Sequence, residues 1–241
     1  MYNIPDKYKK ESIINKENFV PIEETSNNKK KIRQSLKRVK LKHQIDKDIP
    51  NLVNDAYNIQ VIMILEVELK SMNHIEYLNE VFQSLLKGYA IIKYIHNDNT
   101  VWGYGYKRLN KQDKNSIILE KSYVTGEIKE NFFFDNFLLY EKYLNFKNIK
   151  NKNDKLGFYI ENMTKAFIIS NKDMLQDYIK ILDSNIFYSL DSTFKLYNIL
   201  EKTIDIKNKL KNKTVTSEKI DLNKNLVNLI KELEAILDER Y

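Results

Sequence analysis

The sequence predicts an α+β fold, in which a small mixed β-sheet is followed by a helical C-terminal half. Between residues 59 and 124, continuous or alternating apolar runs are separated by turn residues, which is typical of strands. From about residue 131 onward, apolar residues instead recur every three or four positions, as in amphipathic helices. We therefore place an α/β domain with an N-terminal arm at residues 1–130, and a helical region at 131–241.

The composition excludes several classes of protein. The 241 residues include no cysteine, so disulfides, thiolate nucleophiles and cysteine metal sites are excluded. The spacing of His43, His74 and His96 matches no common metal-binding motif, and no glycine-rich phosphate loop occurs, so we expect no metal and no cofactor. No apolar run approaches the ~18 residues of a membrane span, and the first residues lack an apolar signal core. We therefore expect a cytoplasmic protein that does not bind membranes.

The stretch between residues 59 and 124 predicts a β-α-β-β-β unit. A central strand begins as an apolar run and then alternates with charged residues, and Gly88 is placed to end the helix that follows. The residues around Asp98 form a turn signal between two strands of a hairpin. The predicted elements are a strand at 59–70, a helix at 74–87, and strands at 89–96, 100–107 and 115–124.

A basic stretch precedes this unit. Residues 29–45 contain eight Lys or Arg and no acidic residue. Within them, the residues Ile32, Leu36, Val39 and His43 fall at helical spacing, so the pattern predicts a basic amphipathic helix. Residues 1–28 show little periodicity and are expected to form an irregular arm.

Six cations of the basic stretch are the candidate binding residues. The formal net charge of +7 and the pI of about 9.1 favour an acidic partner. The cations would contact the phosphate backbone of a nucleic acid, or dock on an acidic protein surface. A third interpretation is a solvated helix in a lysine-rich chain. The candidate residues are Lys30, Lys31, Arg33, Lys37, Arg38 and Lys40.

Glu66, Glu68 and Lys70 give an alternative, catalytic interpretation. A Glu-x-Lys at the end of a core strand resembles half of a magnesium-dependent nuclease site, in which carboxylates hold the metal and the lysine steadies the attacking water. The carboxylate that such a site takes from a preceding strand is missing, because the nearest aspartates fall in loop or helix-end positions: Asp46, Asp48 and Asp55. A solvated, alternating strand face is the other interpretation.

Trp102, Tyr104 and Tyr106 alternate along one predicted strand and therefore share one face. Aromatic side chains on a sheet face either stack on bases or pack beneath a helix, and we expect core packing here. The intervening Gly103 and Gly105 leave the opposite face thin, so another backbone is expected to approach it closely.

The helical region ends in a leucine-bearing segment. Helices are predicted at 158–169, 172–183, 190–210 and 221–238. The last helix carries leucines that alternate steps of three and four, as a coiled-coil seam does. The seam would dock either on its own domain or on the helix of a partner, and the candidate docking residues are Leu226, Leu229, Leu233 and Leu237.

These features together resemble a bacterial family catalogued as domain-of-unknown-function family 4391. The resemblance covers about residues 1–130 and the tail, and residues 131–215 match no motif of it. The shared features are Ile4-Pro5, the basic stretch 29–45, the strand Ile59 to Lys70, the run Trp102 to Lys107, the pair Ser122-Tyr123 and the charged helix 221–238.

The resemblance implies a biological context rather than a catalytic motif. Members of this family sit beside helicases and DNA methyltransferases in phage-defence or restriction-like loci of bacteria. The expected function is therefore an accessory interaction subunit of a DNA-handling system, with a helicase or methyltransferase as the larger partner and nucleic acid as a second expected partner. A divergent metal-dependent nuclease remains the alternative.

Overall fold

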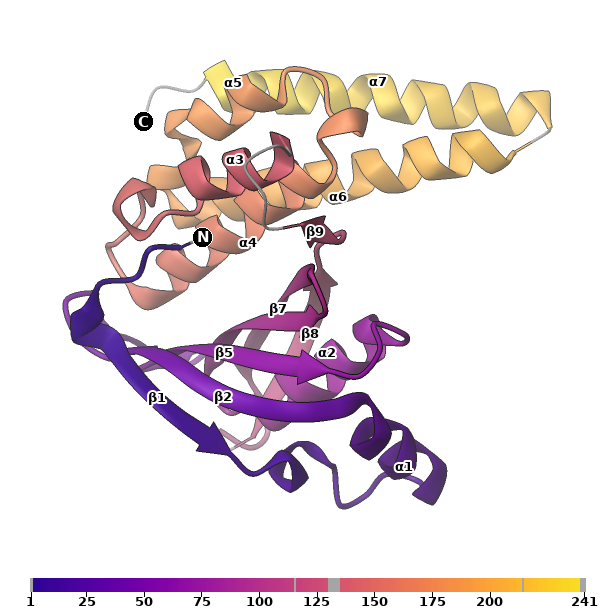
Figure 1. Cartoon of the computed structure of the whole chain (residues 1–241). Coiled ribbons are helices and arrows are strands. Elements are labelled where there is room, and N and C mark those ends of the chain that lie inside the picture. Colours follow the sequence, from indigo (N-terminus) through magenta and orange to yellow (C-terminus); the bar gives the residue numbers. More distant parts are fainter. Residues whose placement is uncertain (1, 115, 130–134, 214, 239–241) are drawn as a thin grey trace.

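The computed structural model describes residues 2–114, 116–129, 135–213 and 215–238. The N-terminal half forms a twisted sheet with one helix against one of its faces, and the C-terminal half forms a set of helices against the other face (Figure 1). The predicted boundary between these parts, at residues 130 and 131, lies outside the described residues. The predicted α+β class is confirmed.

The sheet is built around the predicted β-α-β-β-β unit. Its strand order is β1-β2-β5-β6-β7-β8, and a short β9 also pairs with β7. β5 and β6 run parallel because helix α2 connects them, and the other neighbours pair antiparallel. The bounds are β1 (Lys9–Ile14), β2 (Leu36–Ile45), β5 (Ile62–Leu69), α2 (Ile75–Leu85), β6 (Tyr89–His96), β7 (Asn99–Leu109), β8 (Ile117–Val124) and β9 (Ile128–Lys129). The strands β3 (Leu52–Val53) and β4 (Asn58–Ile59) form a separate small hairpin.

The C-terminal helices are close to the predicted ones, with one correction. The described helices are α3 (Asp135–Tyr143), α4 (Lys155–Ser170), α5 (Tyr178–Asp183), α6 (Leu190–Asn212) and α7 (Thr216–Asp238). The predicted continuous helix at 172–183 is wrong, because a 3-10 turn at Lys172–Met174 is separated from α5. Asp177 interrupts the helical path with a φ of 52°, a left-handed conformation.

The predicted basic helix at 29–45 is also wrong beyond Ser35. Helix α1 (Ser26–Ser35) ends there, and β2 begins at Leu36. In β2, Leu36 pairs with Leu69 of β5 and Val39 pairs with Val67, so three steps on one strand match two on the other. The extra residue is a β-bulge, and it returns both apolar side chains to one face despite their helical spacing.

The N-terminal arm contains a strand that the sequence pattern missed. β1 pairs with β2 at the edge of the sheet, and its residues are almost all exposed. An exposed edge strand has no buried face, so it lacks the alternation that identifies a strand in a sequence.

Helix α2 covers one face of the sheet at close range. A Cβ at Gly103 would lie 2.1 Å from the side-chain oxygen of Asn79, and one at Gly105 would lie 2.7 Å from Gln83. Asn79 donates hydrogen bonds to the Tyr104 carbonyl at 3.0 Å and to Ser122 at 2.8 Å. The predicted close approach of another backbone over the two glycines is therefore wrong in kind, because the groups that lie close to them are the side chains of Asn79 and Gln83 on α2.

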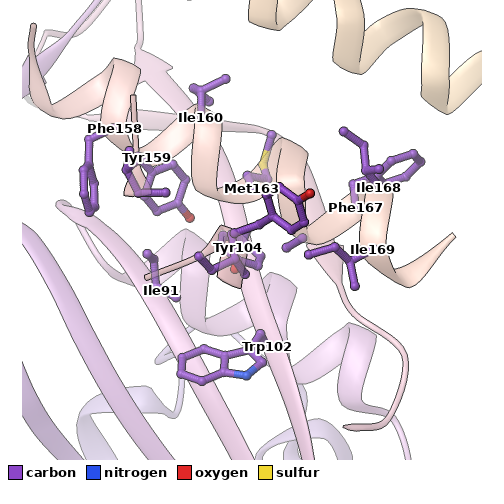
Figure 2. Packing of buried hydrophobic residues seen from close by; sticks show 14 of the residues in the cluster. Ile91, Trp102, Tyr104, Phe158, Tyr159, Ile160, Met163, Phe167, Ile168 and Ile169 are labelled. Atoms are coloured by element: carbon purple, nitrogen blue, oxygen red, sulfur yellow. The ribbon is translucent and has the colours of Figure 1, made fainter. Parts of the chain in front are cut away.

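The opposite face packs against α4, a helix whose residues are buried along nearly its whole length. Tyr159 of α4 donates from its hydroxyl to the Ala90 carbonyl at 2.9 Å and accepts from the Gly105 N–H at 2.7 Å. In Figure 2, Tyr104 lies between Trp102 and the side chains of α4. The predicted core packing of Trp102, Tyr104 and Tyr106 is confirmed: Trp102 and Tyr104 are buried, and Tyr106 packs against the same core.

The core between the sheet and α4 joins both halves of the chain, because it contains residues from Tyr2 to Ile204. Among the described residues, no helix combines the length and the apolar character required to cross a bilayer.

Candidate functional site

The helices cover only part of the sheet face that they contact. At one end of the face, Ile62, Tyr89 and Tyr104 belong to the core shared with α4. Further along β5 and β6, this face changes from buried apolar residues to charged residues that are only partly buried. We call this region the charged half-face, and it consists of Arg38, Lys40, Glu66, Glu68 and Lys93.

Cross-strand pairing accounts for the charges of the charged half-face. Arg38 lies opposite Glu68 and Lys40 lies opposite Glu66 in the β2–β5 ladder. Arg38 forms a hydrogen-bonded ion pair with Glu68, while the ammonium of Lys40 lies 3.7 Å from Glu66. The hydrogen bond from Arg38 holds the pKa of Glu68 below its ordinary value. Opposite charges that face each other across strands stabilise the pairing and fix its register.

The three residues of the nuclease interpretation do not form a metal cluster. Glu66 and Glu68 lie on one face, but the neighbouring strand β2 contributes Arg38 and Lys40 where a metal site would need a further acid. Lys70 lies one residue beyond β5 and is exposed. Within the described ranges, no group of three or more His, Asp or Glu side chains is placed to hold a metal ion.

The six candidate cations fall on two different elements. Lys30, Lys31 and Arg33 lie on α1, and the other three lie on β2. Arg33 donates three hydrogen bonds to Glu17, of 2.8, 2.9 and 3.2 Å, and so connects α1 to the preceding turn. Lys37, Arg38 and Lys40 all approach Glu68, within 4 Å. Of these six cations, Lys30 and Lys31 are the two that are exposed and form no ion pair with residues that the structure describes.

The leucine seam of α7 packs within the chain. α7 runs back along α6, and Leu229 is buried. Leu233 and Leu237 pack against the core that contains α4, and Leu226 is partly buried. Of the two arrangements that the sequence left open, the structure has the seam docked on its own domain, so these four leucines are engaged before any partner arrives.

A cavity beside the charged half-face was not anticipated from the sequence. It has a volume of about 280 Å³ and includes side chains of β2, β5, β6 and β7. Residues 2–4 of the N-terminal segment form a further wall, and Tyr2 contacts Trp102 edge-on, with ring centres 4.5 Å apart. Three polar residues of its wall, Lys42, His43 and Lys93, were not candidates for a shared site, because they are distant in sequence and meet only through strand pairing.

A second charged group lies inside the helical layer. The ammonium of Lys165 is 2.5 Å from the carboxylate of Glu161, and the two side chains are 1% and 0% exposed. Glu161 also accepts the backbone N–H groups of Lys150 and Asn151, at 2.9 and 2.6 Å. This buried pair holds the loop before α4 in place, which is a structural role.

Comparison with known proteins gives one family. No curated protein and no solved structure matches the chain. The family described as a domain of unknown function (DUF4391) matches residues 2–233. The match extends through residues 131–215, where the sequence pattern alone showed no resemblance to the family. The chain therefore belongs to the DUF4391 family.

Proposed function

We propose that this protein is a non-catalytic interaction subunit of a bacterial DNA-handling system of the phage-defence or restriction type. In this proposal it binds a larger partner, a helicase or a DNA methyltransferase, through the basic surface of α1 and the start of β2. Nucleic acid is a second ligand of the same surface.

The observation that carries the proposal is the uneven charge balance of the basic stretch. Among the described residues, the carboxylates that pair with its cations all come from elsewhere in the chain: Glu11, Glu17, Glu66 and Glu68. Lys30 and Lys31 take part in none of these pairs and are exposed on α1, and Lys37 nearby has a side chain that is 67% exposed. Exposed cations that form no ion pair, as Lys30 and Lys31 do here, attract acidic protein surfaces and phosphate groups.

The experiment that tests the proposal is a capture of the tagged protein from its host, with and without nuclease treatment, using wild type and the Lys30→Glu/Lys31→Glu variant. A matched control, Lys195→Glu/Lys202→Glu, reverses two exposed lysines of α6. We expect the α1 variant to capture at least about tenfold less of the partner than wild type does, because two favourable charges become repulsive. The α6 variant should capture as much as wild type.

DNA binding is measured separately, as affinity for a duplex over a range of salt concentrations. If α1 contacts phosphates, the α1 variant lowers the slope of log affinity against log salt by about 1 for each lost contact. Equal capture and equal DNA affinity for both variants would sink the proposal.

The nuclease alternative is tested by incubating plasmid DNA with the protein and magnesium or manganese. The ion pairs of Glu66 and Glu68 leave these carboxylates neutralised by β2, so we expect no cleavage. Cleavage by wild type that disappears in a Glu68→Ala variant would replace the proposal with the nuclease function.

A further inference from the structure

A second basic surface lies in the helical layer, at the end of α3 and on the loop that leads from it to α4 (Figure 1). Residues 142–153 contain four lysines and no acidic residue, and we call them the basic loop. The lysines are Lys142, Lys147, Lys150 and Lys152. The first two are exposed and the other two are half-buried. None of the four forms an ion pair with a carboxylate among the residues that the structure describes.

The hydrogen bonds of these lysines do not neutralise their charge. The ammonium of Lys150 donates to the backbone carbonyls of Asp183 and Ser184, at 2.7 Å each. The ammonium of Lys142 donates to the hydroxyl of Tyr143 at 2.8 Å. Carbonyl and hydroxyl oxygens carry no net charge, so they orient an ammonium and leave its positive charge in place. Each ammonium has three N–H donors, so both lysines keep at least one donor for a ligand.

Two carboxylates act on these lysines from the helices beside the loop. They are Glu161 of α4 and Asp183 of α5. Glu161 is buried and already paired with Lys165. Burial lowers the pKa of Lys150 and of Lys152, and the two carboxylates do not offset it. The four lysines of the basic loop and Lys165 therefore face two acids, and the surface keeps a surplus of positive charge.

Aromatic rings lie beside the lysines of the basic loop. The ammonium of Lys150 is 5.7 Å from the centre of the Tyr188 ring, and that of Lys152 is 5.1 Å from the centre of the Phe146 ring. Tyr188 is 52% exposed, so its ring is open to a further stacking partner. Surfaces that bind single-stranded nucleic acid combine cations, which contact the phosphates, with aromatic rings on which bases stack. The bases of a duplex are already stacked on one another, so an exposed ring favours a single strand.

The basic loop is held in one conformation before any ligand arrives. The Glu161 carboxylate accepts the backbone N–H groups of Lys150 and Asn151, at 2.9 and 2.6 Å. The side-chain amide of Asn148 donates to the Lys142 carbonyl at 2.7 Å. A surface that is already ordered loses less conformational entropy when it binds.

We propose that the basic loop binds single-stranded nucleic acid, with the phosphates held by its four lysines and a base stacked on Tyr188. This surface is separate from the α1 surface, so the inference does not rest on the proposed function. Either assignment can fail while the other holds.

The test is a titration of fluorescently labelled oligothymidylate, followed by fluorescence anisotropy at several salt concentrations. An oligonucleotide of about 20 residues exceeds the site of a typical single-strand binding domain. We expect saturable binding by wild type. Lys147→Gln/Lys152→Gln should bind at least about fivefold more weakly, and should lower the slope of log affinity against log salt by about 0.7 for each lost phosphate contact. Tyr188→Ala should also weaken binding at least about fivefold, with an unchanged salt slope, because stacking releases no counterions.

Controls then assign the binding to the basic loop. Lys195→Gln/Lys202→Gln, which removes two exposed lysines of α6, should bind the oligonucleotide as wild type does. Circular dichroism checks that each variant is folded. If the double variant of the loop is unfolded, Lys147→Gln alone changes an exposed position and should lower the salt slope by about 0.7. Polyglutamate of similar length tests an acidic protein as the partner.

Three results would overturn the inference. The first is the absence of a saturable signal with oligothymidylate. The second is polyglutamate binding as tightly as the oligonucleotide, which would assign the surface to an acidic protein. The third is wild-type affinity in both the folded loop variant and Tyr188→Ala.

Discussion

Two groups of ion pairs in this protein have the same chemistry and different surroundings. In the helical layer, Lys165 and Glu161 are fully buried, and backbone N–H groups complete the coordination of the carboxylate. On the charged half-face, Arg38 and Glu68 pair across two strands with side chains that are 44% and 20% exposed. The first group is closed on every side, whereas the second borders a cavity and solvent.

This difference distinguishes charged side chains that stabilise the fold from charged side chains that are available to bind a ligand. Breaking a buried pair leaves an ion without compensation, so its members are fixed by the fold. A half-exposed pair gains little from its partner and can exchange it for water, salt or a ligand. Of the two groups of ion pairs, the one on the charged half-face is therefore expected to be open to a ligand, although the helical layer holds more buried polar groups.

The largest expected effect is that of Lys165→Met. It leaves the Glu161 carboxylate buried without its counter-ion, and we expect a loss of about 3–5 kcal/mol in the free energy of unfolding. Urea denaturation followed by circular dichroism measures it. The double variant Glu161→Gln/Lys165→Met removes both charges and should recover much of the loss. If Lys165→Met were as stable as wild type, the buried pair and the pairs of the charged half-face would not differ in their contribution to stability.

Lys107 provides a second test of buried charge, through pH. Burial lowers the pKa of Lys107 to about 7, and its amine donates to the Leu86 and Gly88 carbonyls at 2.8 Å each. In the unfolded chain the pKa returns to about 10.4, so between pH 7 and 10 the unfolded state binds the extra proton. The free energy of unfolding should therefore rise with pH, by up to about 1.4 kcal/mol per unit.

The measurement is a series of denaturation curves between pH 7 and 9.5, below the range in which the buried tyrosines of the core titrate. Lys107→Met removes the titrating group and should flatten the profile relative to wild type. An identical slope in both proteins would mean that Lys107 is charged in the folded state.

Gly103→Ala tests whether the close packing of α2 on the other face of the sheet requires a residue without a side chain at this position. The new Cβ would meet the side-chain oxygen of Asn79 at 2.1 Å, so either α2 or the strand must shift. We expect a loss of about 1–3 kcal/mol, as for other overpacked sites. Gly126→Ala is the matched control, because nothing lies within 4 Å of its added Cβ. Thermal denaturation should show a lower melting temperature for the first variant only.

The smallest expected effect is that of Glu68→Gln on the charged half-face. The pair with Arg38 is half-exposed, so we expect a change below about 1 kcal/mol, which shrinks further in high salt. Urea denaturation at two salt concentrations checks both points. A loss as large as that of Lys165→Met would show that the charged half-face is part of the structural core.

The sequence predicts those parts of the fold whose signals are local. Strand β6 has the predicted bounds, and β5, α2, β7 and β8 lie within three residues of theirs, because each carries its own apolar pattern and turn residues. The strand β2 was misassigned because a bulge gives its apolar residues the spacing of a helix. Its acidic partners, Glu66 and Glu68, are more than 20 residues away in the chain, and no local pattern shows such pairing.

The candidate site, too, could be predicted from the sequence only where its signals are local. Glu66 and Glu68 could be singled out as a pair, since they alternate on one strand. Their neighbours Arg38, Lys40 and Lys93 were placed beside them only by strand pairing. The charge of the stretch 29–45 is visible in the sequence, but the sequence does not show that most of that charge is already partnered across the fold.

The core that contains α4 has a consequence for the order of synthesis and folding. It joins Tyr2, which contacts Trp102, to residues as late in the chain as Ile204. A ribosome must therefore release most of the chain before the first residues can reach their final positions. Until then, one sheet face with Trp102 and Tyr104 is uncovered, and a nascent chain paused at this stage is a natural substrate for chaperones.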